Sequence, residues 1–315
     1  MIHNYVTHLV NDLSDDFMKK YTYKDSGSNI KINLVLEGGL FNGSYLTGCL
    51  FYLKELEKRN FIQIQKLSGC SIGSIIALLY FLHDEEVILN IYKLAYKHFK
   101  EKYNVNIFNK IFKILRDHLP NNIMDLIKNN KIYITYFNVE NCKQIVKCKY
   151  KSLEDLFETI RRSCSFPYIV DNTIYYKKKY IDGLYPYVFP NNNNNNNNNT
   201  RNLYLNIHHL NKISGMLSVK NENTNIHRVL EGVIEAHIFF NNSYKTNICS
   251  FTDEWNLYDL FFYYGFIVFM KVFIYILNKV YVINNLINKS IINSKMNMNK
   301  FFYNIYIFLL NSYCI

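Results

Sequence analysis

The stretch IQKLSGCSIGSIIALL, residues 64–79, is the part of the sequence on which the predicted fold depends. It is a short apolar run that breaks at residues 69–73, GCSIG, and then restarts as an apolar helix. This pentapeptide fits G-x-S-x-G, a pattern in which a strand reverses sharply into a helix and the serine takes a strained position at the apex. Gly69 and Gly73 are expected there because a Cβ atom at either position would collide where strand and helix converge. Ser71 is therefore a candidate nucleophile.

The residues around this turn predict alternating strands and helices. Residues 32–36 read as a buried strand that ends at the glycine loop 37–39, EGG, and residues 43–59 carry apolar residues at helical spacing. A second strand is expected at residues 62–67, and residues 71–82 form the helix after the turn. This order is a βαβα unit, so we expect a parallel sheet in this part. The predicted fold class is α/β, with a central, mostly parallel sheet and helices on both faces.

Further along the chain the same alternation continues. Residues 85–129 are helical and basic, with the main break at Pro120, and nine consecutive asparagines at 191–199 predict a solvated loop because they cannot bury apolar surface. The other elements expected are strands at 132–139, 144–148, 173–175, 179–181 and 203–207, and helices at 152–163 and 224–240.

The C-terminal tail is more apolar than the rest of the chain. Residues 260–277, LFFYYGFIVFMKVFIYIL, are interrupted only by Gly265 and Lys271 and are just long enough to span a bilayer as a helix. Their aromatic content and the lysine also suit a helix that lies in the membrane interface, or a packed core helix. Periodicity does not separate these three arrangements. A second apolar run at 301–310 is too short to span.

Composition and charge limit the partners. The chain has 315 residues, of which 49% are hydrophobic, enough for one large α/β domain and an appendage. Its net charge of +11 calls for an acidic partner or surface, or reflects a solubilising surface. Seven scattered cysteines without metal-binding spacing indicate reduced intracellular thiols. No secretory or lipidation signal is visible, so we expect an intracellular protein, cytoplasmic or peripheral to membranes.

Acyl transfer needs a nucleophile, a base and donors for an oxyanion. With Ser71 as the nucleophile, the donors are expected from the N–H groups of Gly38 and Gly39, where a strand ends in bare backbone. Two residues are candidates for the base. Asp182 stands at a strand end before a glycine turn, and His208 would complete the order serine, acid, histidine of the α/β-hydrolases.

Four short motifs follow one another along the sequence in an order and at a spacing similar to those of a known protein family. They are the loop 37–43, the turn 69–73, residues 163–167 and YIDG at 180–183. In this series, which covers residues 32–190, the sequence resembles the patatin-like phospholipase family. The resemblance implies a three-layer α/β fold in which a serine-aspartate dyad works without histidine, metal or organic cofactor.

Carried over by residue, the resemblance makes Ser71 the nucleophile, Asp182 the base, and the amides of Gly38 and Gly39 the oxyanion hole. Gly43 closes the glycine loop, Gly69 and Gly73 flank the turn, and Gly183 follows the base. The implied reaction is hydrolysis of a carboxylic ester of a lipid, a phospholipid or lysophospholipid, through an acyl-serine intermediate. The implied partners are this lipid and an anionic membrane surface, with no nucleic acid expected.

The sequence departs from the family's usual pattern at three positions. Leu40 replaces a loop glycine, Asn42 stands where an arginine is usual, and Leu184 ends the turn after the aspartate. These departures suggest an alternative, a catalytically inactive relative that binds lipid or acts as a membrane scaffold.

Three parts of the chain are expected. They are an N-terminal lead-in of residues 1–30, a patatin-like acyl-hydrolase domain of residues 31–225, and a helical, apolar extension of residues 226–315 with possible membrane association. The basic charge and the extension both fit a protein that docks on a membrane to reach its lipid.

Overall fold

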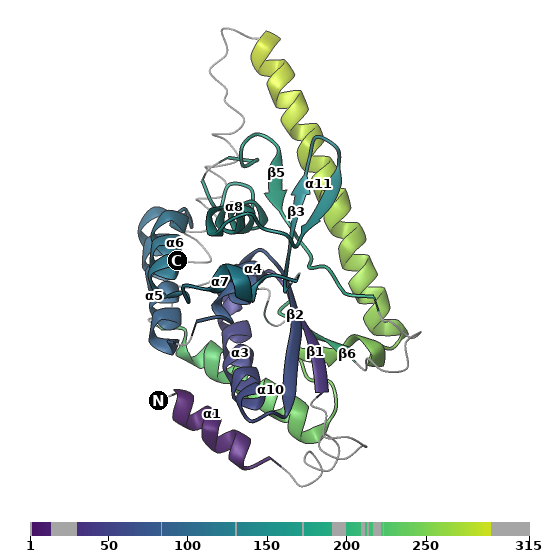
Figure 1. Ribbon diagram of the computed structural model, residues 1–315. Coiled ribbons are helices and arrows are strands. Elements are labelled where there is room, and N and C mark those ends of the chain that lie inside the picture. The colour runs from purple at the N-terminus through teal and green to yellow at the C-terminus, as the bar shows by residue number, and fades with distance from the viewer. Residues whose placement is uncertain are drawn as a thin grey trace.

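A single mixed sheet lies at the centre of the molecule (Figure 1). The computed structural model describes residues 2–13, 30–82, 84–129, 131–171, 173–190, 200–208, 212, 214–216, 222 and 224–290, with side chains up to residue 279. The strand order is β4-β3-β2-β1-β6-β7, and β5 also pairs with β3. The central pairs are parallel, whereas β4, β5 and β7 join antiparallel. The strands are β1 (Ile30–Leu36), β2 (Ile62–Cys70), β3 (Ile132–Asn138), β4 (Lys143–Lys147), β5 (Tyr180–Asp182), β6 (Thr200–Leu205) and β7 (Cys249–Phe251).

The helices follow the predicted alternation, and the α/β class with a mostly parallel sheet is confirmed. Helix starts follow local capping: the Asp84 side chain accepts N–H bonds from the first turn of α5, and Ser152 does the same for α8. The helices are α1 (Ile2–Asn11), α3 (Gly43–Lys58), α4 (Ile72–Leu79), α5 (Glu85–Lys102), α6 (Phe108–His118), α7 (Ile123–Leu126), α8 (Leu153–Ser163), α10 (Ile226–Asn242) and α11 (Leu257–Ser290), with short 3-10 turns η1 (Leu40–Asn42), η2 (Ser214–Met216) and η3 (Thr252–Glu254).

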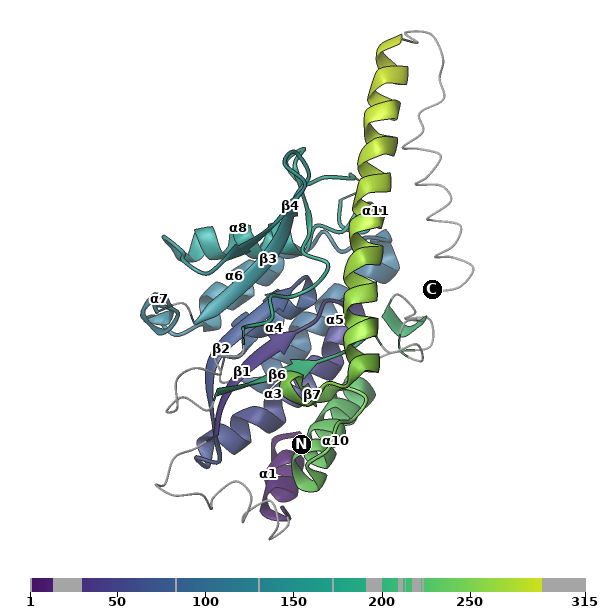
Figure 2. The same ribbon diagram turned by 90° about the vertical axis from the view of Figure 1, so that its right-hand side faces the viewer.

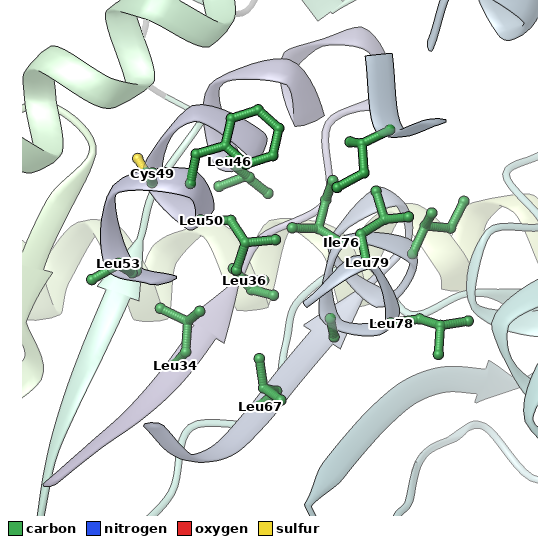
Figure 3. Packing of buried hydrophobic residues seen from close by; sticks show 14 of the residues in the cluster. Leu34, Leu36, Leu46, Cys49, Leu50, Leu53, Leu67, Ile76, Leu78 and Leu79 are labelled. Carbon is green, nitrogen blue, oxygen red and sulfur yellow. The ribbon is translucent and has the colours of Figure 1, made fainter. Parts of the chain in front are cut away.

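The main core lies between one face of the sheet and most of the helices. Alternate residues of β1, such as Leu34 and Leu36, point to this face and meet leucines of α3 and isoleucines of α4 (Figure 3). α10 packs so closely on α3 that a Cβ atom at Gly48 would lie 1.9 Å from the carbonyl oxygen of Val229. α10 and β7 lie within residues expected to form the C-terminal extension, yet they pack in this core and extend the sheet.

The opposite face of the sheet is covered by aromatic side chains. Val35 and Tyr204 point to this side and pack with Phe189, Trp255 and Tyr263. The last of these belongs to α11, so the sheet lies between helices on one face and α11 with an extended segment on the other, as in a three-layer fold.

α11 runs along the side of the domain and extends beyond it (Figure 2). Its stretch Leu257–Lys279 is long and apolar enough to cross a membrane, but only 6% of the apolar window is buried. One face packs on the domain through Ile274, which is 3% exposed, whereas Phe261 and Phe269 are 73% and 63% exposed. α11 is therefore not a packed core helix.

Local details differ from the predicted elements in two places. Residues 173–175 form no strand, since only an isolated bridge joins Tyr176 to Tyr180, and β7 was not predicted. A three-residue strand such as β7 carries too little periodicity to be recognised. The asparagine run 191–199 and the second apolar run 301–310 lie outside the described residues.

Candidate active site

Ser71 lies at a sharp turn between β2 and α4. Its backbone angles, φ 50° and ψ −130°, are sparsely populated for a residue with a side chain and store about 1–3 kcal/mol of strain. The turn is tight on both sides. A Cβ atom at Gly69 would lie 2.4 Å from the carbonyl oxygen of Gly73, and one at Gly73 would lie 2.4 Å from that of Leu36. Only glycine at these two positions leaves room for the strand-to-helix reversal that presents the Ser71 hydroxyl.

Strand pairing brings Asp182 to this turn. Cys70 pairs with Thr135 on β3, and the next residue of β3, Tyr136, pairs with Asp182 at the end of β5. The turn after Asp182 is also tight, because a Cβ atom at Gly183 would lie 2.2 Å from the carbonyl oxygen of Thr135. Two residues that are far apart in the sequence are thus held at the same edge of the sheet.

The Asp182 carboxyl group is 2% exposed and carries a perturbed pKa. Burial raises this pKa to about 6, although the nearby Ser71 hydroxyl, the Leu184 N–H and the charge of His208 each oppose the rise. The Leu184 N–H donates to Oδ1 at 2.8 Å, whereas Oδ2 is buried and makes no well-formed hydrogen bond to the described residues. Asp182 therefore has an oxygen available to take a proton, and it titrates close to neutrality.

A tripeptide at the end of α8 connects the serine turn to the aspartate turn. The Ser163 Oγ accepts the Ser71 N–H at 2.9 Å, and the Ser163 carbonyl accepts the Gly183 N–H at 3.2 Å. Cys164 Sγ donates to the Ser71 carbonyl at 3.1 Å. The Ser165 carbonyl accepts the Asp182 N–H at 3.0 Å. These bonds set the distance between the hydroxyl and the carboxylate.

We expect Ser163→Ala to lower the rate at which Ser71 reacts by about 10- to 100-fold. The substitution leaves the buried Ser71 N–H without its acceptor, which costs about 1–3 kcal/mol and loosens the turn. Ser165→Ala is the matched control, because the Ser165 hydroxyl bonds the Arg161 carbonyl of its own helix and only the Ser165 backbone holds Asp182. Equal losses in the two variants, measured as labelling rates by a serine-reactive phosphonate, would contradict this role.

The glycine loop leaves β1 beside Ser71. Leu36 pairs with Gly69, and a Cβ atom at Gly38 would lie 2.8 Å from that of Ser71, so the loop backbone touches the turn. Burial raises the pKa of the Cys70 thiol, and the nearby Gly38 N–H partly opposes this rise. Gly39 has φ 152°, which favours glycine, and its N–H has no backbone acceptor among the described residues.

Glu37 anchors the start of this loop. Its buried carboxylate accepts hydrogen bonds from the Tyr204 hydroxyl at 2.5 Å and the Ile207 N–H at 3.0 Å. His208 Nδ1 lies 2.7 Å from Glu37 Oε2. Burial opposes charge on both groups, but their mutual attraction outweighs it, so the pKa of Glu37 is lowered and that of His208 is raised. A buried ion pair therefore fixes the loop from the side away from the Ser71 turn.

This pairing bears on the alternative base. The His208 ring contacts Glu37 and lies against Phe266 of α11, with ring centroids 4.8 Å apart. Its charge acts on Asp182 through space and lowers the Asp182 pKa. The triad of Ser71, Asp182 and His208 stays a prediction. The neighbouring histidine in the sequence, His209, lies outside the described residues.

The structure shows what surrounds the three residues that depart from the family pattern. Asn42 is fully buried and accepts a hydrogen bond at 2.9 Å from Arg228, a guanidinium that α10 brings to the glycine loop. Leu40 has φ 47° and lines a cavity beside Ser71. Leu184 packs in an apolar cluster with Ile274 of α11. The guanidinium that contacts the loop also pairs with the Glu222 carboxylate.

A small apolar cavity of about 70 Å³ opens at Ser71. Its walls come from η1, α4, α5, α6 and the segment between α5 and α6. The lining residues are Leu40, Phe41, Ser71, Ile72, Ile75, Tyr92, Ala95, Val105, Ile107, Phe108, Ile111 and Cys164. A serine hydroxyl at the mouth of an apolar cavity suits a substrate with a hydrocarbon chain.

Several of these positions were not predicted from the sequence. Ser163 was part of a motif without an assigned role, whereas Glu37 and Arg228 received no role at all. No local pattern marks them, since each acts through a partner distant in the sequence. Within the described ranges, no group of three or more histidine, cysteine or acidic side chains is placed to hold a metal ion.

Comparison with known protein families matches residues 34–194 to patatin-like phospholipase. A comparison with curated proteins found no match. The matched range covers about half of the chain and contains the glycine loop, the Ser71 turn and Asp182. The chain therefore belongs to the patatin-like phospholipase family.

Proposed function

We propose that this protein is a lipid acyl hydrolase that uses Ser71 and Asp182 as a catalytic dyad. Membership of the family implies lipid acyl hydrolase activity in general. The observation that carries the residue assignment is the placement of Asp182 beside the Ser71 turn, where its buried carboxyl has an Oδ2 without a hydrogen-bond partner among the described residues and a pKa raised to about 6. The apolar cavity at Ser71 supports a fatty acyl ester as the substrate.

The reaction follows from these positions in two steps. Ser71 Oγ attacks the ester carbonyl while Asp182 takes its proton, and the negative charge that forms on the carbonyl oxygen is stabilised by the amides of Gly38 and Gly39. The alcohol then leaves with the proton from Asp182, and an acyl-Ser71 ester remains. In the second step Asp182 takes a proton from water, the hydroxide attacks the acyl-serine, and the fatty acid departs as Ser71 recovers its proton.

The test combines covalent labelling with a lipid panel. A fluorophosphonate probe should label the full-length protein, and mass spectrometry of the digested protein should place the label on Ser71. The same preparation should release fatty acid from a phospholipid or lysophospholipid, and labelling should abolish this release. If the folded protein shows no labelling and no hydrolysis, the result would support the alternative, an inactive lipid-binding relative.

The labelling rate should depend on pH through Asp182. The carboxyl accepts the Ser71 proton only when ionised, so the rate should rise with pH through about 6 and level off above it. Below that value the rate should fall about tenfold for each pH unit. A histidine base would behave differently, because the pKa of His208 is raised above its ordinary value. A rise in the labelling rate at higher pH that disappears in His208→Gln would therefore support the triad instead.

We further propose that α11 docks the protein on a membrane surface, lying along it rather than crossing it. The inner face of α11 packs on the domain, where Ile274 meets Leu184 and Phe266 meets His208, and a helix surrounded by lipid would lose these contacts. The outer face exposes large apolar side chains that are left for lipid, including Phe261, Phe269 and Val272.

Phe261→Ser combined with Phe269→Ser should weaken binding to anionic vesicles by at least about tenfold, because each ring loses burial in lipid. Added salt should weaken wild-type binding as well, because the chain carries a net charge of +11. Deletion of residues 255–315 should also reduce binding, but it uncovers the apolar cluster beside Asp182. Tyr244→Ser is the control, an aromatic residue 62% exposed outside α11. Unchanged sedimentation of the double variant with vesicles would contradict this docking.

A further inference from the structure

A second cavity adjoins the one at Ser71, because the two share lining residues. Its volume is about 200 Å³, and it extends between α5 and the start of α10. Phe41 and Tyr92 line both cavities. The two hollows are thus separated by two aromatic side chains, one from the glycine loop and one from α5.

These two rings are held from different elements. Phe41 lies in η1 and is 7% exposed, and it packs edge-on against Phe99 and Tyr96 of α5 with centroids 5.2 Å and 6.0 Å away. Tyr92 is also 7% exposed and lies close to the loop, since a Cβ atom at Gly43 would be 2.4 Å from its hydroxyl oxygen. Edge-to-face packing of this kind fixes the position of a ring.

The size of the first cavity limits what it holds. One water molecule needs about 10–15 Å³ of such volume, so about 70 Å³ encloses only the first few carbon atoms of an acyl chain, and the rest of a long fatty acyl group extends beyond the cavity. The second cavity is about 200 Å³ and adds apolar wall from Leu89, Tyr96 and Ile226, next to polar residues that include Lys93 and Glu222. A longer chain on Ser71 needs this added space, and Phe41 and Tyr92 stand in its way.

We propose that Phe41 and Tyr92 form a gate that sets the acyl-chain length accepted at Ser71. With both rings in place, the enzyme prefers esters of short acyl chains. Displacing or shortening a ring joins the cavities and admits long chains. This proposal rests on the proposed function, since it concerns the substrate of the same serine.

The test compares a short-chain and a long-chain ester of the same alcohol, p-nitrophenyl butyrate and p-nitrophenyl palmitate, on the full-length protein. In Phe41→Ala and in Tyr92→Ala, the ratio of kcat/KM for the long ester to that for the short one should rise at least about tenfold over wild type, because the buried methylene groups gain a binding site. Tyr92→Phe keeps the ring and should leave the ratio unchanged.

The ratio is used because Phe41 belongs to the glycine loop, and its replacement can lower all rates together by disturbing the oxyanion donors. Tyr92 lies on α5, so a change in the ratio shared by both variants reports the gate and not damage to the loop. An unchanged ratio in both alanine variants that still hydrolyse butyrate would overturn the gate and leave the proposed function intact. Wild-type protein that hydrolyses neither ester, does not react with the fluorophosphonate probe and releases no fatty acid from phospholipid would overturn both.

Discussion

Replacing Ser71 with alanine is expected to abolish fluorophosphonate labelling and to lower the rate of lipid hydrolysis by at least about 10⁴-fold. In the proposed mechanism the hydroxyl oxygen forms the acyl-enzyme, and loss of a nucleophile removes nearly all of the covalent route. At 1.36 kcal/mol for each factor of ten, this loss corresponds to about 5 kcal/mol of transition-state stabilisation. The measurement is fatty acid release from phospholipid, followed together with labelling on matched amounts of folded protein.

Ser68→Ala is the matched control for this experiment. Ser68 lies on β2, the strand that ends just before Ser71. Its hydroxyl is buried without a hydrogen-bond partner among the described residues, so its loss should leave activity near the wild-type level. Ser71→Gly adds a second readout. Glycine adopts φ 50° without the strain that Ser71 carries, so this variant should be inactive and yet unfold a few degrees higher. Hydrolysis retained in Ser71→Ala would exclude Ser71 as the nucleophile.

Asp182→Asn is expected to lower the rate of hydrolysis by about 10² to 10⁴-fold, the usual contribution of a general base. The amide has nearly the shape of the carboxylate and its oxygen still accepts the Leu184 N–H, so the turn should persist. The variant should also lose the rise of the labelling rate through pH 6, because the group with a pKa of about 6 is gone. The measurements are kcat on a lysophospholipid and the labelling rate as a function of pH.

The control for this second prediction is Asp171→Asn. Asp171 lies on a nearby loop and accepts hydrogen bonds from Thr173, away from Ser71. Its replacement should change neither kcat nor the pH dependence. A full loss of activity in Asp182→Asn without any change in the pH profile of the residual labelling would contradict the assignment of Asp182 as the base.

Much of the fold was predictable because its signals are local. The strand, turn and helix around residues 64–79 appear as β2 and α4, and the helices at α3, α8 and α10 begin and end close to their predicted bounds. Periodicity and glycine placement act within a few residues, so they can be read along the chain. Short elements were predicted less well. β7 was not predicted, and the strand predicted at 173–175 is not observed.

The candidate site was only partly predictable. Ser71 and Asp182 stand in recognisable motifs, and the sheet brings them to one edge. The bond from the Ser71 N–H to Ser163 and the pairing of Glu37 with His208 each join residues more than 90 positions apart. Such contacts leave no spacing pattern in the sequence, so they emerge only once the strands are paired.

The sequence by itself determined the α/β class, the sharp serine turn, the glycine loop and the apolar character of the last helix, because backbone geometry and hydrophobic spacing are local properties. Only the tertiary structure decided how the site is completed. Packing placed Arg228 beside Asn42, put two aromatic rings across the cavity at Ser71, and left one face of α11 exposed. The physical reason is that burial, and with it the raised pKa of Asp182, arises only when distant segments exclude water together.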